Sequence, residues 1–153
     1  IVFGDWSSDV CSSDLYATHM KDHDFVKEMH HHRENIQKTF NEYGWDGAWY
    51  QMATTDEGLV LGSHENEEGQ IFLMPNAWAI MTDILPKERI PQVIDSVKTH
   101  LLRDYGTLLN YPAFTKPRTD IGYVTRYAPG LRENGGVYTH AATWAVSIFA
   151  KAN

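Results

Sequence analysis

The residues best suited to chemistry lie in the segment 131–140, which reads Leu-Arg-Glu-Asn-Gly-Gly-Val-Tyr-Thr-His. It places a carboxylate, Glu133, and a carboxamide, Asn134, directly before two glycines. Paired glycines allow positive backbone φ and let the main chain come close to a ligand. Such a loop can present these side chains and free N–H groups at the start of a helix, which we predict from Thr139. The alternative is a tight turn capped by its own polar side chains.

A second candidate for binding a polar ligand is the stretch 45–50, where Trp45 and Trp49 flank Asp46. Aromatic faces beside a hydrogen-bonding acid suit a sugar ring, which is apolar on its C–H faces and polar at its rim. We therefore treat Trp45, Asp46 and Trp49 as possible sugar-stacking residues. The competing interpretation is a buried tryptophan pair that fixes a hairpin to the helices.

Two further clusters of titratable residues are weaker candidates for chemistry. His30, His31 and His32 are adjacent inside a helical pattern, so they point around the helix and cannot converge on one metal ion. A solvated helix face explains them better. The acids of residues 63–69 could do acid–base work, but a solvated acidic turn is the commoner cause of such a run. We predict no metal site.

Residues 1–15 do not resemble an evolved protein sequence. For one choice of codons, residues 4–15 back-translate to a common short-read sequencing adapter. We therefore predict that residues 1–15 are not native, and we exclude them from reasoning about the fold. The single cysteine, Cys11, belongs to this stretch, so the remaining chain has no disulfide framework and no cysteine metal site.

The charge pattern argues against two classes of partner. The formal net charge of −7 becomes −4 for residues 16–153, because the excluded stretch holds three acids and no base. A mildly acidic chain without a basic block is a poor candidate for binding nucleic acid or an anionic membrane. No apolar run approaches the length of a membrane span and no signal peptide precedes the body, so we expect a cytoplasmic protein. A helical pattern still continues at Asn153, and we therefore expect an internal fragment of a longer protein.

Apolar periodicity predicts a mainly α-helical chain with one small β-hairpin. A capping aspartate, Asp22 or Asp24, and a stop at Gly44 bound a long amphipathic helix over about residues 22–42. Two short β-prone runs around an Asp-Glu-Gly turn predict the hairpin within residues 51–62.

Two more helices are expected in the middle of the chain. Asn76 should cap a buried helix over residues 77–85, which is apolar on nearly every side. Pro91 suits the first turn of the next helix, which we expect to end at Gly106. The expected apolar stripe of that helix comprises Ile90, Val93, Ile94, Val97, Leu101 and Tyr105. Residues 107–130 have no long period and predict a long, aromatic-rich loop of the kind that often carries function.

Five motifs run in order along the chain with sensible gaps. They are Trp-Asp-Gly-Ala-Trp-Tyr at 45–50, the run 61–73, Pro-Asn-Ala-Trp-Ala at 75–79, the Thr-Lys-Pro and Ile-Gly-Tyr-Val-Thr-Arg runs within 115–126, and Pro-Gly-Leu-Arg-Glu-Asn-Gly-Gly at 129–136 with Thr139, His140 and Trp144. Together they resemble the inverting disaccharide phosphorylases of glycoside hydrolase family 94. The resemblance covers roughly residues 16–153 and implies a fragment of an (α/α)6 toroid catalytic domain, with the hairpin as an insertion.

The resemblance also implies an activity for the longer protein. Inorganic phosphate, as co-substrate, would cleave a β-glucosidic or β-N-acetylglucosaminyl bond of a disaccharide or β-glucan with inversion, giving an α-sugar 1-phosphate. The resemblance implies no cofactor. It implies that the longer protein is a homodimer. The family's general acid is an aspartate in an Asp-Trp-Asn-Asp motif upstream of this segment. We therefore expect no catalytic residue in the fragment, which should be inactive alone, and Asp5 in the excluded stretch is not assigned that role.

The residues that the resemblance carries over bind substrate. Glu133 matches the family's sugar-hydroxyl ligand, and its loop is shaped by Asn134, Gly135 and Gly136. Further expected substrate-binding residues are Arg126, Tyr138 and His140. Two other functions stay open, namely an α-toroid glycoside hydrolase and a noncatalytic carbohydrate-binding or scaffold domain.

Overall fold

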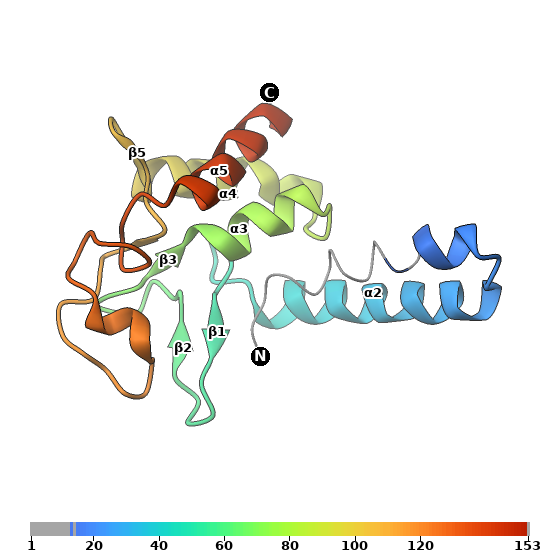
Figure 1. Ribbon diagram of the computed structural model, residues 1–153, viewed down its shortest axis with the longest axis horizontal. Helices are drawn as coiled ribbons and strands as arrows, with labels where there is room; N and C mark the ends of the chain where they lie inside the picture. The colour runs from blue at the N-terminus through green and yellow to red at the C-terminus, as the bar shows by residue number, and fades with distance from the viewer. Residues whose placement is uncertain (1–12, 14, 153) are drawn as a thin grey trace.

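The computed structural model describes residues 13 and 15–152, so the predicted adapter translation, Asp5 included, lies almost entirely outside the described residues. Three helices, α3, α4 and α5, form the body, and α2 extends away from it (Figure 1). The elements are α2 (His23–Tyr43), β1 (Ala53–Thr54), β2 (Val60–Leu61), β3 (Ile71–Phe72), α3 (Leu73–Met81), η1 (Lys87–Arg89), α4 (Ile90–His100), β4 (Leu102–Arg103), β5 (Gly106–Thr107), β6 (Asn110–Tyr111), η2 (Tyr123–Arg126) and α5 (Thr139–Lys151).

The core lies where α3 packs against α5 and α4. The residues of α3 are apolar on nearly every side, and most of them are buried, as predicted. Ala77 and Ala79 of α3 and Ala141 and Ala145 of α5 are buried. Small side chains let two helices approach closely. The prediction of a mainly α-helical chain is confirmed. The described residues also form small antiparallel sheets beyond the one hairpin that was predicted.

Helix α2 begins and ends where the sequence predicted. The Phe25 backbone N–H donates to Asp22 Oδ1 at 3.1 Å, and Gly44 caps the other end by donating its N–H to Phe40 O. Within α2, Phe40 is the buried residue, and Phe25 is 38% exposed. The apolar stripe of this helix is therefore only partly covered by the rest of the chain.

In the part of the chain that the structure describes, three two-stranded antiparallel sheets lie between the helices. The β1–β2 hairpin is the one that the sequence predicted. The β3–β6 pair, with Ile71 opposite Tyr111 and Phe72 opposite Asn110, was not predicted. It ties the start of α3 to the long loop, because β3 runs directly into that helix. The β4–β5 pair follows α4.

The predicted N-cap at Asn76 is wrong. Helix α3 begins at Leu73, so Asn76 lies inside its first turn and is fully buried. Its side chain pairs with the main chain of Tyr50 instead: the Tyr50 N–H donates to Asn76 Oδ1 at 2.9 Å, and Asn76 Nδ2 donates to Tyr50 O at 3.3 Å. The helix also ends at Met81 rather than at residue 85.

The predicted end of α4 is also wrong, although Pro91 does occupy its first turn. The helix stops at His100, the β4–β5 pair follows, and Tyr105 is 74% exposed rather than part of the apolar stripe. Gly106 lies in β5 with φ +138°, where a Cβ atom would be 2.7 Å from Val137 Cγ1. A contact distant in sequence therefore requires this glycine, which the pattern had suggested as a helix stop.

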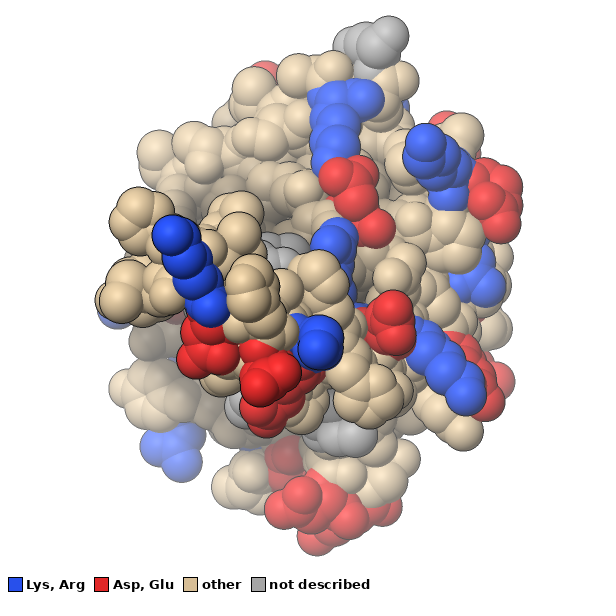
Figure 2. Space-filling view, turned by 90° about the vertical axis from the view of Figure 1, so that its right-hand side faces the viewer, with Lys and Arg blue, Asp and Glu red and all other residues tan. Residues whose placement is uncertain are grey.

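Charged side chains of both signs are mixed on the face shown in Figure 2. Lysines and arginines are scattered over it and mostly lie beside acids, so this face offers no continuous basic surface. Among the helices that the structure describes, none has the length and apolarity needed to cross a bilayer. The expected absence of nucleic-acid and membrane partners stays a prediction.

Replacing Asn76 tests whether its amide holds the Tyr50 segment. In Asn76→Ala the Tyr50 N–H and C=O lose their buried partner, which typically costs about 1–3 kcal/mol. We expect amide hydrogen exchange of the peptide containing Tyr50 to accelerate by about 10- to 100-fold. The matched control is Gln92→Ala, which removes an exposed side-chain bond to Gly47 O. Equal exchange in both variants would contradict the role assigned to Asn76.

Candidate functional site

The segment that carries Glu133 folds into a tight turn. The Gly130 N–H donates to Asn134 O at 2.8 Å, and the Asn134 N–H donates to Leu131 O at 3.1 Å. Arg132 has a positive φ of +51° within this turn. The tight turn that the sequence allowed is therefore present, and the presentation of Glu133 to a ligand stays a prediction.

Asn134 anchors the turn from inside. It is fully buried, and its Oδ1 accepts the Phe114 N–H at 2.8 Å. Its Nδ2 donates to Phe114 O and to Tyr127 O, both at 2.8 Å. Both amide protons are therefore used within the protein. Asn134 therefore holds three stretches of irregular chain together. Its predicted part in substrate binding stays a prediction.

The two glycines after Asn134 are required by internal contacts. Gly135 has φ +73°, and a Cβ atom there would lie 2.8 Å from Ala113 Cβ. At Gly136 a Cβ atom would lie 2.5 Å from Arg132 O. A larger residue at Gly135 would push the turn away from the neighbouring loop, and one at Gly136 would clash with the backbone of the turn itself. The Gly135 N–H also donates to Asn110 Oδ1, a buried acceptor that the sequence analysis did not single out.

Glu133 has one carboxylate oxygen that the described residues leave without a hydrogen bond. Its side chain is 41% exposed, but Oε2 is shielded from solvent. The Arg132 Nε lies 3.4 Å from this oxygen and forms an ion pair with it, while no described group donates a hydrogen bond to it. Buried polar atoms in proteins almost always have a hydrogen-bond partner. Oε2 is therefore an unusual acceptor in the described protein, and the predicted binding of a sugar hydroxyl by Glu133 stays a prediction.

Aromatic and basic side chains surround this turn. The Arg132 guanidinium lies 4.9 Å from the centre of the Tyr127 ring, and Tyr127 O accepts from Asn134. Arg132 and Tyr127 were not among the predicted site residues. The position of Arg132 directly before Glu133 in the sequence could have indicated it. The structure thus brings together Glu133, Arg132 and Tyr127.

The other expected substrate-binding residues lie on neighbouring segments. Arg126 sits in η2 with its guanidinium 5.5 Å from the Tyr123 ring centre. His140 is exposed in the first turn of α5, and its ring lies edge-on to Trp144 at 5.0 Å. Tyr138, directly before α5, is also exposed. None of these contacts joins Arg126, His140 or Tyr138 to Glu133, so their substrate-binding roles stay predictions.

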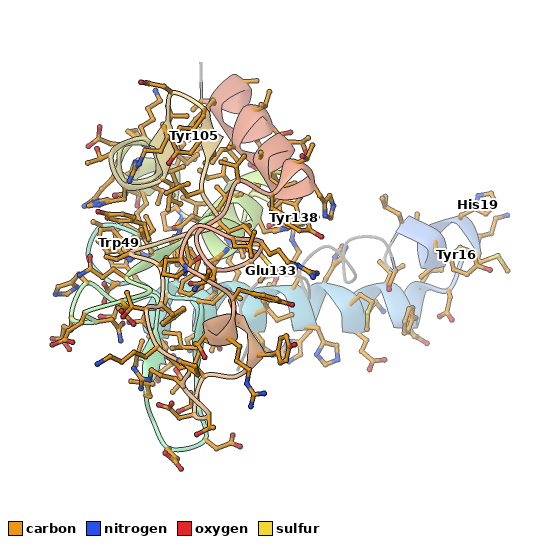
Figure 3. The ribbon with its side chains drawn as sticks, turned by 60° about the vertical axis from the view of Figure 1, so that its left-hand side comes forward. Tyr16, His19, Trp49, Tyr105, Glu133 and Tyr138 are labelled. Atoms are coloured by element: carbon orange, nitrogen blue, oxygen red, sulfur yellow. The ribbon has the colours of Figure 1, made fainter. Side chains whose placement is uncertain are left out.

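The tryptophans of residues 45–50 lie within or against the core. Trp49 is buried, and its indole N–H donates to Gly62 O at 2.9 Å and to Gln70 O at 3.0 Å. Trp45 packs against Tyr50 and lies under the Arg89 guanidinium, 4.4 Å from its ring centre. These contacts give both rings the structural role that the sequence also allowed. Figure 3 shows Trp49 well separated from Glu133 and Tyr138.

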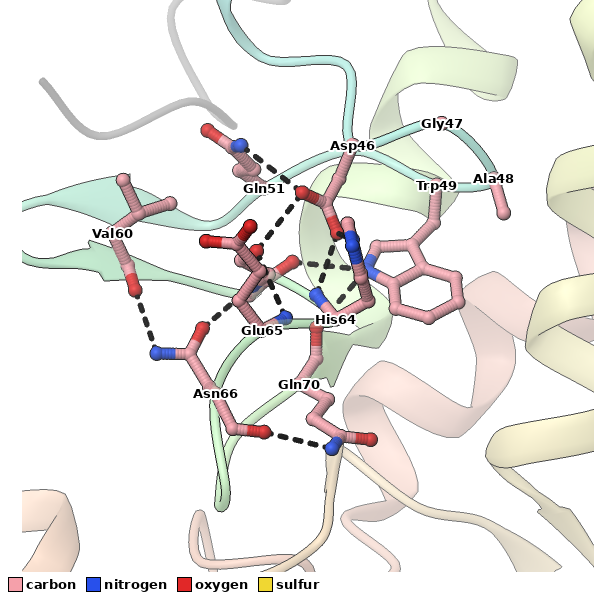
Figure 4. A network of polar contacts seen from close by, with 12 residues as sticks. Asp46, Gly47, Ala48, Trp49, Gln51, Val60, His64, Glu65, Asn66 and Gln70 are labelled. Atoms are coloured by element: carbon pink, nitrogen blue, oxygen red, sulfur yellow. Dashed lines mark hydrogen bonds and ion pairs between the residues drawn. The ribbon is translucent and has the colours of Figure 1, made fainter.

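Asp46 lies at the centre of a polar network (Figure 4). Its side chain is 7% exposed. Oδ2 accepts both the His64 N–H, at 2.6 Å, and His64 Nδ1, at 2.7 Å, and Oδ1 accepts the Ser63 hydroxyl at 2.9 Å. Gln51 Nε2 lies 3.4 Å from the same Oδ1. The hydrogen bond and the negative charge of Asp46 raise the pKa of the exposed His64 imidazole.

No set of metal ligands stands out among the described residues. Groups of three or more histidine, cysteine or acidic side chains that could hold a metal ion do not occur in this part of the chain. His31 and His32 are exposed on α2, where His31 pairs with Asn35 and His32 with Glu28 along the helix. Among the carboxylates of residues 63–69, Glu68 bonds to the long loop, since its Oε1 accepts the N–H of Thr115 at 3.0 Å and its hydroxyl at 2.5 Å.

Comparison with known proteins identifies relatives of this chain. The model of the glycosyl hydrolase 94 superfamily catalytic domain matches residues 13–152. Cellobionic acid phosphorylase from Neurospora crassa is 34% identical over 84% of this chain and 16% of its own length. Solabiose phosphorylase from Paenibacillus borealis is 33% identical over 88% of this chain and 18% of its own length. N,N'-diacetylchitobiose phosphorylase from Vibrio proteolyticus is 36% identical over 72% of this chain and 14% of its own length. The chain therefore spans less than a fifth of the length of these relatives.

The Asp46–His64 pair predicts a pH dependence. Because the folded protein raises the His64 pKa above 6.5, the pair stabilises the fold fully below about pH 6.5, and this contribution is lost as the pH rises through the raised pKa. Histidine C2-hydrogen exchange followed by mass spectrometry measures the His64 pKa. We expect Asp46→Asn to return it toward 6.5 and Glu67→Gln to leave it unchanged. An identical His64 titration in the protein and in Asp46→Asn would refute the pairing.

Proposed function

Because the chain belongs to the glycosyl hydrolase 94 superfamily, we propose that it is part of the catalytic domain of an inverting disaccharide phosphorylase. The whole enzyme, which we call the parent enzyme, cleaves a β-glucosidic or β-N-acetylglucosaminyl bond with inorganic phosphate and releases an α-sugar 1-phosphate. The three relatives named above support this, since each is a phosphorylase of a disaccharide or of an oxidised disaccharide by its name. The segment alone is inactive, because its own residues include no assigned proton donor.

The observation that carries the proposal is that the shielded Oε2 atom of Glu133 has no hydrogen-bond partner among the described residues. A sugar hydroxyl is a donor of the right kind for it, and a hydrogen bond to an ionised carboxylate is roughly twice as strong as one between neutral groups. The turn presents Glu133 beside the Arg132 guanidinium and the Tyr127 ring. Asn134 and the two glycines fix that turn. Glu133 is therefore proposed to bind a hydroxyl of the sugar whose bond is cleaved.

The chemistry follows the inverting scheme. One carboxylic acid protonates the leaving oxygen while the nucleophile attacks the opposite face of the sugar. With phosphate as the nucleophile, no carboxylate is needed to activate a water molecule. Hydrogen bonds to sugar hydroxyls strengthen as positive charge develops on the ring in the transition state. Glu133 would supply one, and Arg126, Tyr138 and His140 are proposed to contact the sugar or the phosphate from neighbouring segments.

Phosphate dependence is the experiment that tests this reaction. The parent enzyme should release sugar 1-phosphate only when inorganic phosphate is present. Release of two free sugars without phosphate would identify an α-toroid hydrolase instead. A parent gene without the upstream Asp-Trp-Asn-Asp segment would support a noncatalytic carbohydrate-binding or scaffold domain. A cytoplasmic location and a homodimeric parent stay predictions.

Glu133→Gln tests the sugar-binding carboxylate. In the parent enzyme we expect kcat/KM for the disaccharide to fall by about 10- to 100-fold, because a hydrogen bond to a charged group typically contributes about 1.5–3 kcal/mol. The thermal unfolding temperature should change little, since Oε2 makes no hydrogen bond within the described protein and its ion pair with the exposed Arg132 contributes little to stability. Initial rates of sugar 1-phosphate release measure the effect. Glu67→Gln, on an exposed acid, is the control, and unchanged kinetics in Glu133→Gln would remove this residue from the site.

We further propose that α2 to α5 belong to an (α/α)6 toroid whose remaining helices lie in other parts of the parent enzyme. The partly uncovered stripe of α2 supports this, as do the exposed side chains of Met20 and Val146. Apolar surface of this kind usually contacts another part of a protein.

The 153-residue chain expressed alone is the test of that arrangement. We expect it to be poorly soluble or only partly folded, because the missing helices would leave apolar surface exposed to water. Size-exclusion chromatography and a thermal melt measure this. A monomer with a sharp cooperative melt would contradict a toroid that is completed elsewhere.

A further inference from the structure

We propose that Asp46 is a positioning residue for the substrate site, which holds the Glu133 turn in place through a relay of loops without touching the sugar. The proposal rests on the proposed function for the role of Glu133. It assigns to Asp46 a task other than the sugar contact that the sequence suggested. The relay runs from Asp46 to residues 63–69, then to residues 112–115, and finally to Asn134 beside Glu133.

The first step joins Asp46 to residues 63–69. The carboxylate is almost completely shielded, and both of its oxygens accept hydrogen bonds from Ser63 and His64 (Figure 4). The Ser63 N–H donates in turn to Asn66 Oδ1, so the bend after β2 is fixed at several atoms. Such a carboxylate has little capacity left for a sugar hydroxyl. Its hydrogen bonds instead hold one loop against another.

The second step joins residues 63–69 to the long loop. The Gly69 N–H donates to Pro112 O at 2.7 Å, and Glu68 Oε1 accepts from both the backbone and the hydroxyl of Thr115. The buried Phe114 ring lies directly on Gly69, where a Cβ atom would be 2.6 Å from Phe114 Cζ. A shift of residues 63–69 would therefore displace the backbone of residues 112–115.

The third step reaches the substrate site. Asn134 accepts the Phe114 N–H and donates to Phe114 O, and both residues are almost fully buried. A displacement of Phe114 is thus passed to Asn134 and to its neighbour Glu133. In an enzyme site, a misplacement of about 1 Å can cost about 100-fold in rate. A carboxylate distant from the substrate can therefore control turnover by setting where Glu133 lies.

A double-mutant cycle in the parent enzyme tests the relay. Asp46→Asn places an amide where the His64 N–H and the Ser63 hydroxyl donate, so part of the network must break. We expect kcat/KM to fall by about 10-fold or more in Asp46→Asn, and the same change to cost about twofold or less when Glu133 is already Gln. Multiplicative losses in the double variant would overturn the proposal. Glu67→Gln, on the same loop, is the control and should show no coupling to Glu133.

Hydrogen exchange separates a failure of the relay from a failure of the proposed function. In Asp46→Asn the peptides covering residues 112–115 and 131–136 should exchange faster, and in Glu67→Gln they should not. Unchanged exchange in Asp46→Asn overturns the relay whatever the parent enzyme does. If Glu133→Gln alone leaves kcat/KM intact, the proposed function fails and exchange still decides whether the loops are linked. If Asp46→Asn does not fold, Thr115→Val replaces it in the double-mutant cycle. This variant removes the hydroxyl bond to Glu68, and we expect the same coupling to Glu133→Gln.

Discussion

The fold depends on a single requirement, which is that irregular backbone inside a protein must find hydrogen-bond partners. Here asparagine side chains meet it where no sheet is available. Asn76 pairs with both the N–H and the C=O of Tyr50, and Asn134 does the same for Phe114. Each carboxamide acts like a neighbouring β-strand of one residue, since it offers one donor and one acceptor side by side. The loops can therefore be buried and still hold one conformation.

This arrangement explains how short sheets and long loops form an ordered site on a helical body. The β3–β6 pair links the start of α3 to residues 110–111. From there Asn110 accepts the Gly135 N–H, and Leu109 donates its N–H to Gly136 O. The turn that carries Glu133 is therefore held close to the core, although it belongs to no regular element. Rigid support of this kind is what positioning of a substrate requires.

Local features were predictable from the sequence, and contacts between distant segments were not. Helix α2 follows from its period, its Asp22 cap and its Gly44 stop, all of which act within a few residues. The predictions for Asn76 and Gly106 were wrong because these residue types are common at helix ends, whereas here each is needed for a contact with a distant segment. Asn76 bonds to Tyr50, and Gly106 lies against Val137. The family resemblance pointed to the Glu133 turn, but the contacts that demand its two glycines became visible only in the structure.

The two acids of the predicted site, Asp46 and Glu133, show why residue type alone could not assign their roles. Asp46 lies between two tryptophans and directly before a glycine, and Glu133 lies directly before an asparagine and two glycines. Both could bind a sugar on chemical grounds. The structure distinguishes them by the donors that surround each carboxylate. Asp46 accepts hydrogen bonds at both oxygens from its own chain, so most of its acceptor capacity is already used. Glu133 keeps a shielded oxygen that has Arg132 beside it and no hydrogen-bond donor among the described residues, which is rare for a buried acceptor. The number of internal donors around each carboxylate therefore distinguishes the two acids, although their residue types do not.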